Sequence, residues 1–460
     1  IQWAWESFPE FLDALDRVPL AVDLGTQVPH GAVRAYVMGE RGARNEAATG
    51  QDIERMTAIV KEGLIAGALG FSSSRTIGHK ALDGEPVPGT FASEDELFGI
   101  GRALKETRLG IFELAPAGAA GDSGMDDADI ILEELEWMCR LAKEIDRPVS
   151  FAMLQYDSRP NRWRECLEIA ERAAATGAEV YPQIAGRPFG ILAGHQTIAN
   201  PYRGKPTYDA LSELPLTELA ARLRDPEIRR RILSEDPKPG ANNFFAQPAI
   251  FENVYPLGDP PDYEPAPEDS VAAIAKREGR DVQELAYEMM LRDDCRELML
   301  LPFINYSDRN CDPHREMILN PRAILGLGDG GAHCGIICDA SLPTFMLAHW
   351  ARDRHRGPTL PLEWVVKRMT ADTAKLYGLL DRGVLAPGYK ADINLFDASQ
   401  VGLQRPEMVH DLPSGARRLI QRSRGYEATL VSGQIVMHRG EPTEARPGRL
   451  LRGPRSVAAA

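Results

Sequence analysis

AILGLGDGGAHCG, residues 323–335, is a short apolar run that ends in one carboxylate, two glycines and a histidine. A continuous apolar run is typical of a strand that is buried on both faces. In barrels and open α/β sheets, the chemistry lies where such strands end. We therefore predict a strand that delivers Asp329 to a loop at the carboxyl edge of a sheet. On this local pattern alone, Asp329 could equally cap the turn that follows it.

Strands and helices alternate along most of the chain. Apolar strand candidates begin at residues 21, 68, 109, 148, 178, 297 and 323, and stretches with helical periodicity separate most of them. This alternation predicts a parallel sheet or barrel. Seven strands are fewer than the eight of a TIM barrel. Because the sequence starts inside an amphipathic stretch at Ile1, we expect the first strand or two to lie upstream.

The pattern predicts two domains. Residues 1–380 are expected to form the barrel, and the proline-dense stretch at about 189–267 is expected to form a lid within it, with one helix at 216–233. Residues 381–460 contain short alternating strands with glycine turns, typical of a small β-sandwich portion and a tail. The predicted fold class is α/β: a (β/α)8 TIM-like barrel that lacks its first strand or two, followed by a C-terminal β-sandwich domain.

Composition excludes several classes of partner. The 53 basic and 67 acidic side chains give a net charge of −14, which argues against a nucleic-acid or anionic membrane surface. The sequence shows neither a signal-type start nor an apolar run of the roughly 20 residues that span a bilayer. We therefore expect a cytoplasmic protein that acts on a small molecule, and a homo-oligomer stays open. The six cysteines do not suggest a disulfide framework.

Polar residues at the predicted strand ends are candidates for a site, although each has an ordinary structural alternative. Glu113 lies inside an apolar strand, where a carboxylate needs partners. Arg75 is suited to binding a substrate carboxylate through paired hydrogen bonds. The other candidates at strand ends or in the following loops are His30, His79, Tyr181, Gln183, Arg187, His195 and His333. We treat four further histidines, in predicted helices or in the C-terminal region, as structural: His349, His355, His410 and His438.

Several stretches together resemble the amidohydrolase superfamily, and within it the N-acyl-D-amino-acid deacylase (D-aminoacylase) branch. WAWESFPEFLDAL with VDLGTQVPHGAVRAYVMG, GALGFSSS and EVYPQIAG resemble the early helix and strands of these enzymes. LGDGGAH resembles the last-strand motif that presents their catalytic Asp. The most specific match is MTADTAKLYGLLDRGVLAPGYKADINLFD, followed by VSGQIVMHRGEPTEARPGRLLR, which marks the return from the barrel to the β-sandwich domain.

The resemblance implies a metal-dependent hydrolase that cleaves the amide C–N bond of N-acyl amino acids. Zinc or another divalent metal would polarise the acyl oxygen and activate water, and Asp329 would act as the general acid/base. Asp329 would also be a metal ligand, with Glu113 and His195 as weaker candidates. His333, Arg75, Tyr181, Gln183, Arg187 and His30 are the residues expected to bind substrate.

Two departures from the family pattern keep other functions open. Family members usually carry a His-x-His pair on the first barrel strand, with a Cys soon after it, and histidines on middle strands. Here the first set is absent, and the middle strand VSFAMLQ contains no histidine. One alternative is therefore a diverged member that binds a ligand without hydrolysis. Another is a cyclic-amide hydrolase of the hydantoinase or dihydropyrimidinase kind, although the strand ends offer none of the lysines that those enzymes carboxylate.

Overall fold

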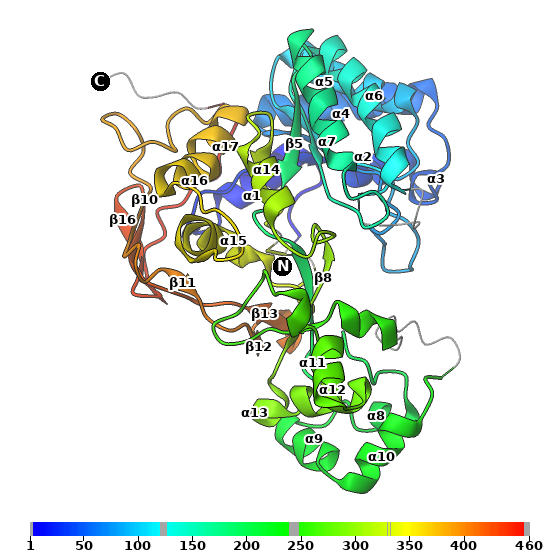
Figure 1. Cartoon of the computed structure of the whole chain (residues 1–460). Helices are drawn as coiled ribbons and strands as arrows, with labels where there is room; N and C mark the ends of the chain where they lie inside the picture. The colour runs from blue at the N-terminus through cyan, green and yellow to red at the C-terminus, as the bar shows by residue number, and fades with distance from the viewer. Residues whose placement is uncertain (1–2, 120–126, 239–247, 329, 332, 455–460) are drawn as a thin grey trace.

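A six-stranded parallel sheet forms the centre of the chain. This computed structural model describes residues 3–119, 127–238, 248–328, 330–331 and 333–454 (Figure 1). The strands are β1 (Val28–Pro29), β2 (Gly70–Ser74), β3 (Ile111–Ala115), β4 (Val149–Ala152), β5 (Val180–Ile184) and β9 (Ile324–Leu325). They are neighbours in this order and pair in parallel. The sheet therefore follows the chain as a barrel wall does.

Helices connect the strands and cover one face of the sheet. They are α1 (Phe8–Asp16), α2 (His30–Met38), α3 (Glu40–Ala43), α4 (Gly50–Ala66), α5 (Glu94–Thr107), α6 (Asp127–Ile145) and α7 (Arg162–Ala175). The alternation predicted for this region is confirmed, with one difference. Of the strand expected at residues 21–29, only Val28–Pro29 pairs with β2.

Side chains alternate between the two faces of these strands, and their register explains which face the helices cover. One row across β2 to β5 is apolar and fully buried in the main core: Phe71, Phe112, Val149 and Val180. The adjacent row is polar: Ser72, Glu113, Ser150 and Tyr181. Packing of the apolar row against the helices leaves the polar row on the opposite face, which in a barrel is the interior.

The proline-dense region forms an ordered insertion with its own core. The prediction of a barrel strand at 297–305 is wrong, because β8 (Met299–Ile304) pairs antiparallel with β6 (Phe189–Ala193) and β7 (Tyr255–Pro256) in a separate sheet. Its helices are α8 (Pro206–Asp209), α9 (Leu216–Leu223), α10 (Pro226–Ser234), α11 (Val271–Glu278), α12 (Val282–Met290) and α13 (Arg292–Cys295). They pack around a second hydrophobic core and project away from the barrel helices, as Figure 1 shows.

Capping residues divide the helices that periodicity had joined. The single helix expected at 216–233 is two helices, because Asp225 caps α10 through the backbone N–H groups of Glu227 and Ile228, and Pro226 occupies its first turn. The periodicity of residues 269–293 also predicts a single helix, but Gly279 ends α11 with φ +66°. Apolar periodicity continued across both breaks, so local cap chemistry decided the boundaries.

The remainder of the chain returns to the barrel and then forms β structure. Its helices are α14 (Asp312–Leu319), α15 (Leu342–Phe345), the π-helix η5 (Met346–Asp353), α16 (Leu362–Met369) and α17 (Ala371–Leu376). A four-stranded antiparallel sheet follows, made of β10 (Ile393–Phe396), β15 (Tyr426–Val431), β16 (Gln434–His438) and β17 (Glu441–Pro442). Two further strand pairs are β11 (Gly402–Leu403) with β14 (Ser423–Arg424), and β12 (Glu407–Val409) with β13 (Arg418–Ile420).

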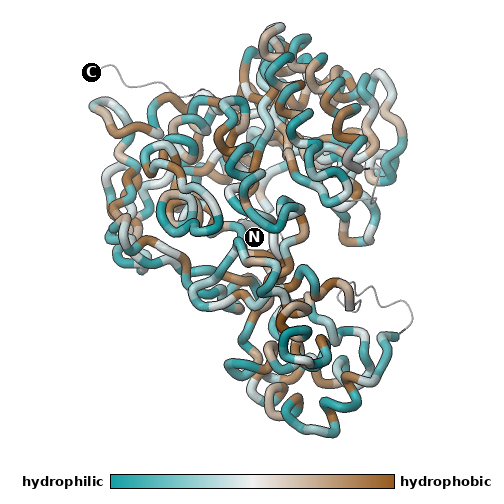
Figure 2. Tube along the Cα trace, in the orientation of Figure 1, coloured by the Kyte–Doolittle hydropathy of each residue, from teal (hydrophilic) through white to brown (hydrophobic). Residues whose placement is uncertain are grey.

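The last described residues run back to the start of the sheet. Leu20 and Leu24 bridge to Gly448 and Leu450, so the C-terminal segment packs beside the segment that leads into β1. Figure 2 shows apolar stretches in both the barrel and the insertion, consistent with two cores. None of the described helices combines the length and the apolar character needed to cross a membrane.

Candidate active site

β9 ends directly before the glycine-rich segment that carries Asp329. Gln183 of β5 is the register partner of Ile324, so the carboxyl ends of the two strands lie side by side. A Cβ added to Gly326 would lie 2.8 Å from the Gln183 Oε1 atom, so glycine allows this close passage. Asp329 itself lies outside the described residues. His333 is exposed and has φ +51°.

A polar network crosses the sheet beside this segment. Glu113, half-buried on β3, accepts hydrogen bonds from the Tyr377 hydroxyl at 2.6 Å and from the Gln27 amide. Burial and then the Glu113 charge raise the pKa of Tyr377, whose hydroxyl also interacts with Gln27 and Gln183. Tyr377 follows α17, so the network joins residues at β1, β3 and β5 to the last barrel helix. We call Gln27, Glu113, Gln183 and Tyr377 the mouth network.

Two of the predicted substrate-binding residues contact the covering helices. The His30 ring nitrogens lie 2.9 Å from Ser73 Oγ and 2.9 Å from Glu96 Oε1 on α5. The Arg75 Nε donates to Glu134 on α6 at 2.8 Å. Both side chains therefore have buried partners on the helix side of the sheet, and the structure does not bring them to the mouth network. Their proposed contact with substrate stays a prediction.

Tyr181 and His195 also have protein partners. The Tyr181 hydroxyl donates to Glu179, and burial, followed by the Glu179 charge, raises the pKa of Tyr181 to about 12. His195 is buried in the insertion, where its Nδ1 lies 2.9 Å from the Tyr208 hydroxyl. Burial and then the charge of Arg203 lower the pKa of His195 to about 3. The structure therefore places His195 in the second core, away from Glu113.

Arg187 follows β5 and is buried. Its Nη2 donates to the Cys338 carbonyl at 2.8 Å and to Asp339 Oδ1 at 3.2 Å. The guanidinium lies 3.8 Å from the ring centroid of Tyr263. Arg187 therefore ties the end of β5 to the segment after Asp329 and to the insertion, and substrate binding by its side chain stays a prediction.

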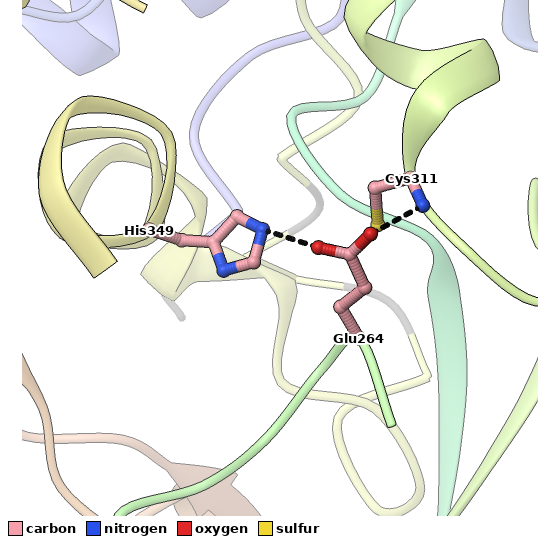
Figure 3. Close-up of side chains that lie close together, drawn as sticks. All are labelled: Glu264, Cys311 and His349. Carbon is pink, nitrogen blue, oxygen red and sulfur yellow. Dashed lines mark hydrogen bonds and ion pairs between the residues drawn. The ribbon is translucent and has the colours of Figure 1, made fainter. Parts of the chain in front are cut away.

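A second buried group lies next to Tyr263 in the sequence (Figure 3). Glu264 accepts a hydrogen bond from the backbone N–H of Cys311 at 2.7 Å, and its Oε2 lies 3.0 Å from Nε2 of His349. Arg354 donates to both carboxylate oxygens, at 3.1 and 3.0 Å. Burial alone would raise the pKa of Glu264, but the nearby His349 imidazole and the hydrogen bonds from Arg354 and Cys311 outweigh it and hold the pKa at about 2. We call Glu264, Cys311 and His349 the Glu264 cluster.

Sequence reasoning missed this cluster. Glu264 was placed in the lid, His349 was treated as structural, and Cys311 was one of six unassigned cysteines. A usable signal was present, because Cys311 and His314 stand three residues apart at the start of α14. That spacing puts two potential ligands on one face of a helix.

The described residues at the strand ends do not fit the metal that the resemblance implies. Such a site needs several nitrogen, oxygen or sulfur donors that converge. Glu113 is already bound by Gln27 and Tyr377, and the residues that follow β4 are Met153, Leu154 and Gln155. In the described part of the chain, the group of His, Cys, Asp and Glu side chains whose ligand atoms converge is the Glu264 cluster, not a set of strand-end residues.

Comparison with known proteins identifies the relatives of the chain. A D-aminoacylase from Alcaligenes xylosoxydans xylosoxydans is 26% identical over 459 residues, which cover 98% of this chain and 74% of that protein. A solved D-aminoacylase structure, described for its binuclear metal centre, has a TM-score of 0.58 at 21% identity and covers 98% of this chain and 75% of that one. The N-acyl-D-glutamate deacylase of Bordetella bronchiseptica, complexed with zinc and a phosphonate inhibitor, has a TM-score of 0.56 at 22% identity, with coverage of 97% and 75%.

These matches confirm two expectations from the sequence. The solved structures share the fold, so the barrel with a C-terminal β domain is confirmed. The resemblance to the D-aminoacylase group is confirmed by relatives that align along almost the whole chain. The model of the amidohydrolase family matches residues 1–437, and the chain therefore belongs to the amidohydrolase family.

Proposed function

We propose that this protein hydrolyses the amide C–N bond of N-acylated amino acids and releases a carboxylate and a free amino acid. The observation that carries the proposal is the D-aminoacylase match along 98% of the chain. The N-acyl-D-aspartate deacylase of the same organism supports it, at 26% identity over 97% of the chain. The substrate would be a small N-acylated D-amino acid, processed in the cytoplasm without nucleic acid or membrane. We keep a homo-oligomer as part of the proposal, to be tested by sedimentation.

Asp329 is the proposed general acid/base. Its sequence position, four residues beyond the end of β9, is where barrel enzymes carry catalytic side chains. The carboxylate would take the proton from the attacking water and return it to the leaving amine nitrogen. Gln183 stands on β5, the neighbour of β9, and Glu113 stands on β3, with β4 between them. Their network with Tyr377 would fix the polar surface beside the reacting groups.

Zinc or another divalent metal belongs to the proposal because relatives carry such metals. The described strand ends do not assemble the donors for a metal of this kind, so we derive no step through it. This disagreement favours a second candidate function, a diverged family member that binds an N-acyl amino acid without hydrolysis. The cyclic-amide alternative has no comparable support, since the relatives reported above are named for deacylation.

The test combines turnover with metal supplementation. The purified protein is incubated with N-acetyl-D- and N-acetyl-L-amino acids in the presence of Zn²⁺, Co²⁺ or Mn²⁺, and release of the free amino acid is measured. We expect activity on the D series, and we expect Asp329→Asn to lower kcat by about 10³-fold or more, as the loss of an acid/base group does. Asp353→Asn, an exposed carboxylate paired with Arg352, is the matched control and should keep its activity.

Two results would overturn the hydrolase proposal. One is the absence of turnover with every metal and substrate while calorimetry detects binding, which would establish the binding function instead. The other is an Asp329→Asn protein with unchanged kcat, which would remove the acid/base role from this residue. Circular dichroism of each variant separates loss of chemistry from loss of fold.

A further inference from the structure

The Glu264 cluster brings together three kinds of ligand atom from three separate parts of the chain. Glu264 lies in the loop between β7 and α11, Cys311 directly precedes α14, and His349 lies in η5. A carboxylate oxygen, the Cys311 sulfur and a His349 nitrogen all lie within 4.8 Å of one another. Glu264 and Cys311 are 1% and 0% exposed. Figure 3 shows the three side chains turned toward one another.

The hydrogen bonds of Glu264 leave one acceptor position, and it is on the side of His349. Oε1 accepts from Cys311 N–H at 2.7 Å and from Arg354 Nη2 at 3.0 Å. Oε2 accepts from Arg354 Nε at 3.1 Å. Each carboxylate oxygen has about two lone-pair sites, so Oε2 keeps one. His349 Nε2 lies 3.0 Å from this oxygen, yet its direction does not meet hydrogen-bond geometry within the described residues. A carboxylate oxygen and an imidazole nitrogen that face the same space without an aligned hydrogen bond are suited to share a cation.

His314 lies one helical turn beyond Cys311 and borders the cluster. It is 1% exposed, and its polar surroundings are the backbone of Arg187 and the charges of Glu264, Arg354 and His349. Its ring nitrogens do not belong to the group of ligand atoms that lie within 4.8 Å of one another. His314 is therefore a neighbour of the three ligands and not one of them.

The charges around the cluster suit a divalent ion. Arg354 is shared between Glu264 and Asp312, which lies 2.7 Å from its Nη2. A dication together with the guanidinium would face two carboxylates and the thiolate that a coordinating cysteine becomes. Asp312 is 63% exposed, so within the buried part the dication and Arg354 face the Glu264 carboxylate and the Cys311 thiolate, and Asp312 offsets the remaining positive charge from the solvent side. Arg354 would act as the outer partner that orients the Glu264 carboxylate.

We propose that Glu264, Cys311 and His349 bind one divalent transition-metal ion of the zinc class. Thiolate sulfur, imidazole nitrogen and carboxylate oxygen are all ligands that zinc accepts in proteins. The ligands come from the insertion, from the start of α14 and from η5, so the ion would fix the base of the insertion against the barrel. The near-complete burial of Glu264 and Cys311 makes the role structural, separate from the hydrolysis proposed for Asp329.

The test is the cobalt spectrum of the full chain. The protein is stripped with a chelator and reconstituted with Co²⁺, whose thiolate complexes absorb by charge transfer in the near ultraviolet. We expect one equivalent of Co²⁺ to give this band, and Zn²⁺ to displace it. Cys311→Ser should lose the band, whereas Cys139→Ser, a cysteine on α6, should keep it. His349→Gln keeps the thiolate, and we expect it to lower the Co²⁺ affinity.

The outcomes separate this site from the proposed activity. The band should persist in Asp329→Asn, and its presence does not depend on turnover. Cobalt binding without a thiolate band, or a band that survives in Cys311→Ser, would overturn the proposal. If Cys311→Ser fails to fold, an unchanged cobalt affinity in His349→Gln would overturn it instead. A thermal unfolding midpoint that a chelator leaves unchanged in the zinc-loaded protein would also contradict it, because an ion bound only by the folded state raises that midpoint.

Discussion

Two carboxylates hold parts of this molecule together, Glu113 in the mouth network and Glu264 at the base of the insertion. Glu113 is half-buried and accepts from neutral donors, the Gln27 amide and the Tyr377 hydroxyl. Glu264 is almost fully buried and accepts from the cationic Arg354 and a backbone N–H, with His349 beside it. Neutral donors leave a carboxylate able to exchange partners, whereas a buried ion pair fixes it. The difference suggests that the mouth can rearrange around a ligand while the base of the insertion stays rigid.

The largest effect is expected from Glu264→Gln. The substitution removes the charge that compensates buried Arg354, which is then paired through Asp312 alone. Loss of one partner of a buried ion pair destabilises by about 3 to 5 kcal/mol. Urea unfolding in the presence of a chelator measures this free energy without a contribution from a bound metal.

The matched control replaces both partners. Glu264→Gln with Arg354→Met leaves no uncompensated charge in the buried site, because Asp312, the other partner of Arg354, is 63% exposed, so part of the lost stability should return. An ordinary surface substitution changes the free energy of unfolding by less than about 0.5 kcal/mol. A change that small in Glu264→Gln would show that the ion pair of Glu264 with Arg354 does not hold the base of the insertion rigid.

The next effect depends on pH and is specific to the insertion. The pKa of His195 is about 3 in the folded protein, below its ordinary value of 6.5. Below about pH 6.5 His195 is protonated in the unfolded chain, whereas in the folded protein it stays neutral down to about pH 3. Stability contributed by the neutral imidazole is therefore present at neutral pH and falls across this window, by on the order of 3 kcal/mol near pH 4.

His195→Gln isolates this contribution, because an amide can still accept from Tyr208 but does not titrate. We expect the free energy of unfolding of the wild-type protein to fall more steeply between about pH 6.5 and pH 4 than that of the variant. Parallel curves for the two proteins would show that His195 is not held neutral by burial.

Periodicity predicted the barrel strands better than it predicted the site. The alternation of Phe71 with Ser72 and of Phe112 with Glu113 identifies strands and their two faces, because a strand repeats every two residues. The same pattern at residues 297–305 gave a true strand in the wrong sheet. A buried apolar run does not specify which sheet its backbone joins, and here the partner β6 lies far away in the sequence.

The candidate functional residues were harder to predict than the strands, because residues from distant segments meet only in the folded protein. Asp329 could be proposed from the sequence because its whole motif is contiguous, and its role stays a prediction. Glu264, Cys311 and His349 come from three distant segments, and only the folding of the insertion onto the barrel brings them together. Glu113 was singled out correctly as a carboxylate that needs partners, but Tyr377, its hydrogen-bond donor from the last barrel helix, was not foreseen.

A smaller effect is expected from Glu113→Gln. Gln27 and Tyr377 both donate to Oε2 of Glu113, so an amide oxygen can keep both hydrogen bonds only as a neutral and weaker acceptor. The loss should be about 1 to 2 kcal/mol, because hydrogen bonds to a charged group contribute more than those to a neutral one. The same urea titration measures the free energy of unfolding of this variant, so the losses in Glu113→Gln and Glu264→Gln can be compared directly.

Tyr377→Phe removes the opposite partner and serves as the control. If the mouth network acts as a unit, the double variant should lose less than the sum of the two single losses. A loss in Glu113→Gln equal to that in Glu264→Gln would erase the difference between a mobile mouth and a rigid base.

The smallest effect is expected at Asp52, a carboxylate that belongs to neither region. It closes the capping box of α4 by accepting from Thr49 N–H at 2.9 Å, and it pairs with half-exposed Arg41 at 2.9 Å. The hydrogen bonds from Arg41 and then Thr49 lower the pKa of Asp52 to about 2. This stability is therefore present above about pH 3.8 and is lost as the pH falls toward 2. Asp52→Asn keeps one acceptor oxygen, so it should cost about 1 kcal/mol at neutral pH. Glu62→Gln, exposed on the same helix, should cost less. A larger loss at Asp52 than at Glu113 would show that helix capping, not the mouth network, limits the stability of the barrel.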